Sequence, residues 1–414
     1  MLNRMTQKLG PGLLFAAGAI GTSHLIQTTR GASTYGLAVC WLIVIACILK
    51  YPAYRAAVEY SGTTGRTLID AYQRAGKWLL APLLIVFLIE GLIAVAGISL
   101  VTAGLTNNLL GLAFDDLKLT LAVIAGTAIV LYVGKYRVLE GITKVFVVLF
   151  CVLVIVTTAL ALPELGNIAE LATQLPVDEP NFTFYIAFAG WMPTGLGASV
   201  TLSVWITAKS TAMGRPVTPS EARLDFHVGY FGTVLLAVGF AIIGTAVLFG
   251  SDTVLSQGST GFAAQLVSVF TQTIGAWTEP LIASAALVVM LSTVISTMDG
   301  LARVYSTFTV RLLSTKGSQV DNARYYGEFL ALQFAVSCIL LLLLMRSFLT
   351  FIDIATTTSF LVAPAVAWFN HRALFAADVP EQQQPGQAFR CWSWVGIVLL
   401  GALAAAFVAL KLAN

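Results

Sequence analysis

The sequence predicts an all-α integral membrane protein with eleven transmembrane helices and no separate soluble domain. Hydrophobic residues make up 58% of its 414 residues and charged residues only 10%, whereas soluble proteins carry about 25% charged residues. The apolar runs are long and continuous, which is typical of membrane-spanning helices rather than of barrel strands. Two of these runs are interrupted by polar and helix-breaking residues at matching places.

The apolar runs define the helices one after another along the chain. The connections between them are short, so residues 1–414 form one transmembrane domain. The predicted spans cover residues 11–29, 34–60, 79–107, 119–134, 142–162, 183–208, 228–249, 280–307, 327–345, 349–369 and 391–411.

The placement of lysine and arginine predicts the orientation of the chain. With a cytoplasmic N-terminus, all but four of the 23 basic residues fall in inner loops or at inner helix ends, Lys50 among them. The outer set consists of Arg30, Lys118, Arg346 and Lys411. We therefore expect a protein of a prokaryotic-type plasma (inner) membrane. Because the number of spans is odd, its C-terminus lies outside.

The two interrupted spans are the first and the sixth. The first break is Gly21-Thr22-Ser23-His24 and the second is Met192-Pro193-Thr194-Gly195-Leu196-Gly197. Their spacing predicts two five-helix repeats of opposite topology, about 11–162 and about 183–369, with an extra helix at about 391–411. Inverted repeats with broken helices 1 and 6 define the LeuT-type fold, whose substrate site lies at the breaks.

Several motifs carry a resemblance to a known family. The chain is similar to the NRAMP (natural resistance-associated macrophage protein) metal transporters over about ten spans. The resemblance implies the LeuT-type fold, eleven helices and alternating access around a midplane site. It rests on Gly10-Pro11-Gly12-Leu13-Leu14, Thr64-Gly65, Tyr136-Arg137-Val138-Leu139-Glu140 and Met192-Pro193.

The departures from the family pattern concern the metal ligands. The family's first-helix motif Asp-Pro-Gly-Asn is replaced by Gly21, Thr22, Ser23 and His24. Its sixth-helix Met-Pro-His becomes Met192, Pro193 and Thr194. In the third helix, whose acidic residues the family uses for proton passage, the stretch Gly91 to Gly97 is apolar and Glu90 precedes it. The sequence resembles NRAMP-related side branches that lack the metal motif.

Without a carboxylate at either break, the predicted site suits a small anion. A helix that begins again after a break exposes free amides and about half a positive charge. Glycines let an anion approach the backbone, and hydroxyls and a histidine add donors. We therefore expect a secondary transporter of a small inorganic anion, with bicarbonate first and chloride, nitrate or a small carboxylate still open. The predicted substrate-binding residues are Gly21, Thr22, Ser23, His24, Met192, Thr194, Gly195 and Gly197.

The alternative substrate is a divalent metal ion such as Mn²⁺, Mg²⁺ or Fe²⁺, carried in an altered NRAMP-type site. Such ions prefer hard oxygen ligands with at least one carboxylate, which the breaks do not provide. Structural roles compete at single positions too. His24 would then bond a neighbouring backbone carbonyl, Met192 would pack in the core, and Gly21, Gly195 and Gly197 would serve close helix packing.

The coupling ion stays open between Na⁺, H⁺ and none. An ionisable residue within the membrane is a functional candidate, and hydroxyls three and four residues apart share one helix face that could cradle Na⁺. The same hydroxyls could instead bond their own helix. Glu90 could equally form a salt bridge or a hydrogen-bonded neutral acid. The coupling candidates are Glu90, Ser292, Thr293, Ser296, Thr297 and Asp299.

Other classes of function have less support from the sequence. A channel needs a repeated selectivity filter, and an enzyme needs a cofactor loop or a catalytic cluster. The chain has neither, and only three histidines. A receptor derived from a carrier stays open. We expect no enzyme activity, no cofactor or resident metal, no nucleic acid and no obligate protein partner. The expected partners are the small anion and the lipid bilayer.

Overall fold

The computed structural model describes residues 10–111, 114–134, 136–166, 175–251, 254–314, 321–344 and 348–413, all of whose regular elements are helices. For a few of them, Thr22 and residues 136–147 included, only the backbone is described. The main helices are α2 (Pro11–Ala19), α3 (Thr29–Tyr35), α4 (Val39–Thr64), α5 (Leu68–Ala75), α6 (Leu80–Leu110), α7 (Asp116–Val133), α8 (Tyr136–Ala161), α10 (Glu179–Trp191), α11 (Ala198–Met213), α12 (Pro219–Leu248), α13 (Ser259–Ile274), α14 (Glu279–Leu313), α15 (Tyr326–Leu344), α16 (Phe348–Leu374) and α17 (Gln387–Ala413).

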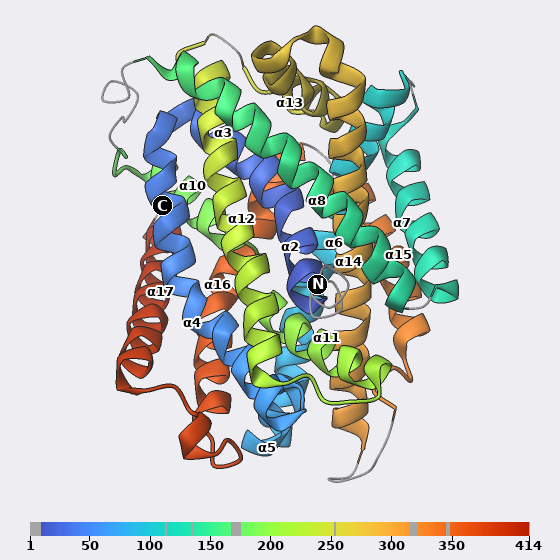
Figure 1. Ribbon diagram of the computed structural model, residues 1–414, viewed down its shortest axis with the longest axis vertical. Coiled ribbons are helices and arrows are strands. Elements are labelled where there is room, and N and C mark those ends of the chain that lie inside the picture. Colours follow the sequence, from blue (N-terminus) through green and yellow to red (C-terminus); the bar gives the residue numbers. More distant parts are fainter. Residues whose placement is uncertain are drawn as a thin grey trace.

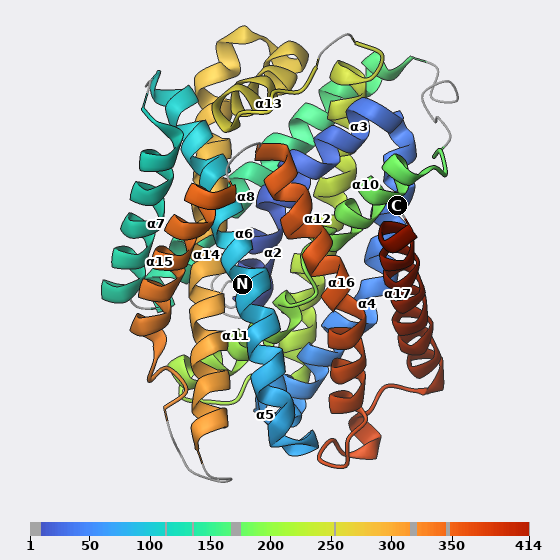
Figure 2. The same cartoon turned by 180° about the vertical axis from the view of Figure 1, so that it is seen from behind.

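The helices form a bundle around α2 and the pair α10 and α11. Figure 1 shows α8 and α12 in front of this centre, and Figure 2 shows α6 and α16 in front of it from behind. Helices α7 and α15 form one flank and α17 the other, while α13 lies across one end. The central helices are buried on most sides, whereas the flanking ones expose large apolar side chains such as Tyr132, Val133, Leu342 and Leu412. This is the arrangement of a bundle immersed in lipid.

The chain is an integral membrane protein by the length and composition of its helices. In the described part, nine helical runs are long and apolar enough to cross a membrane. The first run, Pro11–Thr64, contains the first two predicted spans, and α10 and α11 together correspond to the sixth. The count of eleven spans and the orientation of the termini stay predictions. Five of the basic residues behind the orientation prediction lie outside the described residues: Arg4, Lys8, Lys135, Lys316 and Arg346.

The first predicted break is not unwound. Ile20–Thr28 forms a nine-residue π-helix, η1, which continues α2 into α3. A π-helix keeps its backbone bonds at wider i→i+5 spacing, and such segments are frequent at functional sites. The prediction of free amides at Gly21–His24 is therefore wrong. The polar run there widens the helix without opening it.

The second predicted break is open. Residues 192–197 are non-helical between α10 and α11, and the Met192–Pro193 peptide bond is cis. In Figure 1 the chain runs from α2 to α3 toward the end where α13 lies, and from α10 to α11 away from it. The two half-helix pairs thus run in opposite directions, as inverted repeats require.

The glycine-proline-glycine motif anchors α2 to α12. The amides of Gly10 and Gly12 donate to the Asp225 carboxylate at 3.0 and 2.9 Å, where the positive end of α2 also favours a negative charge. Pro11 opens the helix, where its missing N–H costs nothing. A side chain on Gly12 would overlap the Asp225 backbone. The motif thus packs the start of the first span closely against α12.

Candidate functional site

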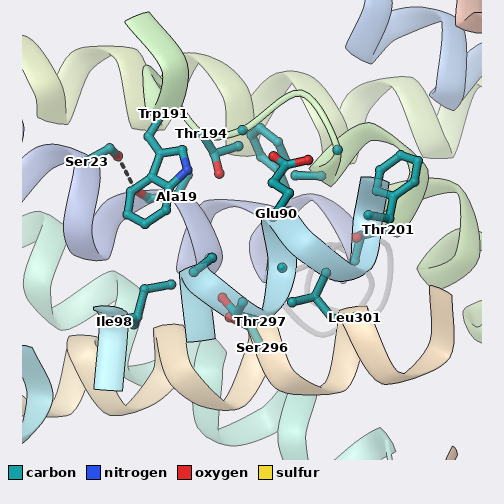
Figure 3. Close-up of a pocket in the computed structure, with 18 of the residues that line it drawn as sticks. Ala19, Ser23, Glu90, Ile98, Trp191, Thr194, Thr201, Ser296, Thr297 and Leu301 are labelled. Atoms are coloured by element: carbon teal, nitrogen blue, oxygen red, sulfur yellow. Dashed lines mark hydrogen bonds between the residues drawn. The ribbon is translucent and has the colours of Figure 1, made fainter. Parts of the chain in front are cut away.

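A cavity of about 100 Å³ lies where η1, α6, the helix-six break and α14 meet. Figure 3 shows the Glu90 side chain in the middle of this cavity, between Thr194 on one side and Ser296 and Thr297 on the other. The apolar part of the wall comes from Phe15, Phe87, Ile98, Trp191 and Leu301. Polar groups are few, which is usual for a small-solute site.

The cavity gathers part of the predicted site. Four predicted substrate residues line the cavity: Ser23, Thr194, Gly195 and Gly197. Three coupling candidates line it as well: Glu90, Ser296 and Thr297. The side chain of Thr22 lies outside the described part of the structure. The predicted residues that do not line the cavity are Gly21, His24, Met192, Ser292, Thr293 and Asp299.

His24 is fully buried behind the cavity wall. Its Nε2 lies 2.8 Å from the Thr233 carbonyl on α12, and its Nδ1 lies 2.7 Å from the Ser23 hydroxyl and 3.0 Å from the Ala19 carbonyl. The Ser23 hydroxyl also lies 2.9 Å from the Pro193 carbonyl in the helix-six break. His24 therefore holds η1 against α12, the structural role left open by the sequence, while Ser23 joins η1 to the break.

Gly21 and Met192 serve packing. A Cβ on Gly21 would lie 2.5 Å from the Thr293 Oγ1 on α14, and that hydroxyl donates to the Ala17 carbonyl at 2.7 Å. Met192 is fully buried in the main apolar core. Gly21 thus lets η1 approach α14 closely, and Met192 fills the core beside the break, the packing roles that the sequence left open.

Glu90 brings a carboxylate to the helix-six break. Its Oε1 accepts a hydrogen bond from Ser359 on α16 at 2.6 Å, while its buried Oε2 has no partner among the described residues. Cβ atoms on Gly195 and Gly197 would lie 2.7 Å from Oε1 and 3.0 Å from Oε2. The expectation of a site without a carboxylate is therefore wrong. Glu90 comes from another helix, so the motif at the break did not reveal it.

The start of α11 is the positive end of that half-helix. The amides of Ala198, Ser199 and Val200 donate to carbonyls of the same turn at 2.9–3.0 Å. The amides of residues 195–197, which precede them, have no acceptor among the described residues. A carboxylate or another anion at this end is stabilised by the helix dipole.

Lys50 approaches the break from its other side, and sequence reasoning missed it. This lysine is fully buried in the middle of α4, so its assignment to an inner helix end is wrong. Its ammonium donates to the carbonyls of Ala189, Gly190 and Thr194 at 2.5, 2.8 and 3.0 Å. Tyr54 donates to two carbonyls of the break. A lysine inside an apolar run was the one available signal.

The remaining coupling candidates belong to structural bonds. Asp299 accepts from Arg303, Trp205 and Tyr326 at 2.8–2.9 Å. Ser292, Thr293 and Ser296 each donate to a backbone carbonyl, and Ser296 does so while lining the cavity. The hydroxyls that line the cavity with no partner among the described residues are those of Thr194, Thr201 and Thr297.

An ion pair between Arg30 of α3 and Asp353 of α16 joins these two helices. Arg30 makes a two-point contact with Asp353 of α16 at 2.7 and 3.1 Å and also donates to Gln27. Its guanidinium lies over the Phe184 ring. Arg30 therefore ties α3 to α16 through Asp353 and to α10 through Phe184.

The donor set is poor for a divalent metal. Within the described residues, no group of three or more histidine, cysteine, aspartate or glutamate side chains could hold a metal ion. Glu90 is the single carboxylate of the cavity wall, and the rest of its polar lining consists of hydroxyls, backbone and indole. The arrangement instead offers one carboxylate, a helix start with unengaged amides, and three free hydroxyls.

Comparisons with known proteins agree with this architecture. No protein-family profile matches the chain. An uncharacterized protein of Pasteurella multocida is 30% identical over 328 residues, which cover 78% of this chain and 75% of that protein.

Solved structures share the fold at low sequence identity. A mutant of the Eremococcus coleocola manganese transporter has a TM-score of 0.74 at 10% identity, covering 97% of this chain and 86% of that one. MhsT in complex with L-phenylalanine has a TM-score of 0.64 at 14% identity over 96% and 97% of the two chains. Mhp1, a nucleobase-cation-symport-1 family transporter, has 0.55 at 14% over 97% and 93%. The chain therefore belongs to the family of the Pasteurella multocida protein, and its fold is the LeuT-type fold of the NRAMP-related transporters.

Proposed function

We propose that the protein is a secondary transporter that carries a small inorganic anion together with a proton, by alternating access around the central cavity. Two of the solved structures that share its fold are transporters by name, one of manganese and one of the nucleobase-cation-symport-1 family. The cavity lies between the first, third, sixth and eighth spans of the predicted order, where such carriers place their substrate.

One observation carries the proposal: the Glu90 carboxylate lies beside the start of α11, with Oε2 unpartnered among the described residues. An incoming anion would be stabilised by the same positive helix end. Two negative charges in a site of low dielectric repel each other strongly. Protonation of Glu90 removes that repulsion, so the anion binds when the proton does. The anion and the ionised Glu90 carboxylate compete for the same helix end. Binding of the anion is therefore coupled to protonation of Glu90.

The buried lysine beside the break favours an anion over a divalent metal. Lys50 contributes a positive charge near Thr194, which lines the cavity. An anion with neutral Glu90 leaves the region close to neutral, whereas a divalent metal leaves an excess of positive charge. Burying unpaired charge costs several kcal/mol per ion. A manganese transporter shares the fold, so metal transport stays the alternative that the experiment must test.

The coupled proton bears on which anion is carried. Bicarbonate moved with a proton is chemically equivalent to CO₂ and water, and CO₂ crosses lipid unaided. Nitrate has the same planar shape and charge but does not take up a proton near neutral pH. We therefore propose that the anion carried together with the proton is nitrate or a similar anion. Bicarbonate is the candidate substrate if the protein carries the anion without a proton.

Reconstituted protein tests the proposal. An inward nitrate gradient across proteoliposomes, with the membrane voltage clamped by potassium and valinomycin, should acidify the lumen of wild-type vesicles. Glu90→Gln should take up labelled nitrate without acidification. The exposed Glu328 provides a control, because Glu328→Gln should behave as wild type.

Two further arms separate the alternatives. Bicarbonate that alkalinises the lumen would support an anion carrier without proton coupling. Uptake of Mn²⁺, followed with a metal-sensitive dye in vesicles that show no response to nitrate, chloride or bicarbonate, would refute the anion proposal. That result would mean that Glu90 and backbone carbonyls suffice for a cation.

A further inference from the structure

The carbonyl end of α10 is covered by a charge from within the chain. Ala189 and Gly190 lie in the last turn of α10, which ends at Trp191, so their carbonyls have no helical amide to accept from. They lie at the negative end of the helix dipole. Buried carbonyls in this position need a cation, a donor side chain or water. Here the Lys50 ammonium reaches both of them and the Thr194 carbonyl as well.

The donor geometry fits a charged ammonium. A protonated lysine has three N–H donors and no acceptor, and Lys50 faces three carbonyl oxygens at 2.5–3.0 Å. The side chain is fully buried. Among the described residues no carboxylate lies within ion-pair distance of it. Backbone carbonyls therefore replace the hydration shell of this charge, as they would for a bound monovalent cation.

We propose that Lys50 is a built-in cation of the helix-six break, occupying a carbonyl site that would otherwise require a bound monovalent cation. The ammonium stabilises the C-terminal end of α10, and the Glu90 carboxylate lies at the N-terminal start of α11. The two half-helix dipoles are thus each matched by a residue of opposite charge. Lys50 is a positioning residue: it fixes the carbonyls of the break and contacts no transported solute.

The structure also provides a route to this carbonyl site. A crevice of about 170 Å³ between α4, α10, α16 and α17 reaches Lys50. Its wall includes Leu49, Ile186, Ala189 and Phe360. Shortening Lys50 to alanine would join the space of the side chain to this crevice. A small alkylammonium ion could then enter and take the place of the lost ammonium.

Chemical rescue of Lys50→Ala tests the inference without any transported solute. The readout is the melting temperature of the purified full chain in detergent. The variant should melt roughly 5 °C below wild type, and methylammonium should restore most of this loss in a saturable way. Tetramethylammonium, which has no N–H donor, should not. Lys50→Met, which fills the space without a donor, should be destabilised and not rescued.

A surface lysine supplies the matched control. Lys77 donates to one carbonyl, that of Ser314, at an exposed site, so Lys77→Ala should show neither the loss nor the rescue. If Lys50→Ala responds to methylammonium no more than wild type does, or if Lys50→Met melts with wild type, the inference is wrong.

A measurement on the wild type guards against a variant that fails to fold. The wild-type melting temperature should be equal in sodium and choline chloride, because the break carries its own cation. A sodium-dependent increase for wild type would overturn the inference. Because no solute is involved, loss of the anion proposal would leave this result unaffected, and the reverse also holds.

Discussion

Replacing Gly195 by alanine tests how tightly the site is built. The new methyl group would lie 2.5 Å from the Ser359 Oγ and 2.7 Å from the Glu90 Oε1. These two atoms are themselves hydrogen-bonded to each other at 2.6 Å. Ordinary contact begins near 3.4 Å, so each atom would have to move by roughly 0.7–0.9 Å, the shortfall from the packing limit. Both side chains are buried.

The expected magnitude follows from this overlap. Overpacking of a well-packed region costs about 1–3 kcal/mol, and the hydrogen bond to the Glu90 carboxylate is weakened as well. If this cost falls on the solute-bound state, the apparent affinity for the anion decreases about 5- to 150-fold, since 1.4 kcal/mol corresponds to a factor of ten. The maximal rate should change less, because folded protein that does bind still cycles.

Proteoliposome uptake measures this effect against a matched glycine. The initial rate of nitrate-driven acidification is followed as nitrate is varied, for wild type, Gly195→Ala and Gly232→Ala. A Cβ on Gly232 of α12 meets nothing within 4 Å, so this control should keep wild-type affinity and gain up to about 1 kcal/mol of helix stability. Wild-type affinity in Gly195→Ala would refute the placement of the solute beside the break and Glu90.

Three further substitutions test packing around the first span. His24→Ala should cost about 2–5 kcal/mol, from an unpaired carbonyl and a cavity, and a melting curve should show it, whereas an unchanged melt with a lost anion affinity would make His24 a ligand instead. Gly12→Ala should abolish folded protein in fluorescence-detected size-exclusion chromatography, because the backbone of Asp225 cannot yield; a monodisperse peak would contradict this. Gly21→Ala should lower the melting temperature, and adding Thr293→Ala, which removes the two nearest atoms, should recover part of the loss; equal melts of the single and double variants would count against the contact.

The two ends of the helix-six break explain why a site can be built here without a bound ion. An interrupted helix leaves carbonyls at one end and amides at the other, and each needs a partner in a region that excludes water. Lys50 and Tyr54 supply the donors for the carbonyls. Glu90 lies at the amide end. Side chains of the protein therefore balance the unpaired carbonyls and amides at the two ends of the break, so the break stays stable whether or not a solute is bound.

The sequence by itself determined the class and the outline of this protein. Long apolar runs predict membrane helices because a lipid environment admits few other structures. Polar and glycine-rich interruptions identify the first and sixth spans, and the second of these is open in the structure. Pro11 opens α2 and Met192-Pro193 follows the end of α10, both positions that local chain geometry favours for proline. Such features depend on neighbours in the chain, so they can be recognised in one dimension.

Only the tertiary structure decided the chemistry of the site. Glu90 comes from α6 and Lys50 from α4, and each reaches the break from more than 100 residues away in the chain. His24, adjacent to the site in sequence, turns away toward α12 because a helix presents successive side chains on different faces. The first span keeps its bonds as a π-helix, which composition cannot distinguish from an open break. The charge of a membrane site is set by which helices pack against it, and that is a property of the fold.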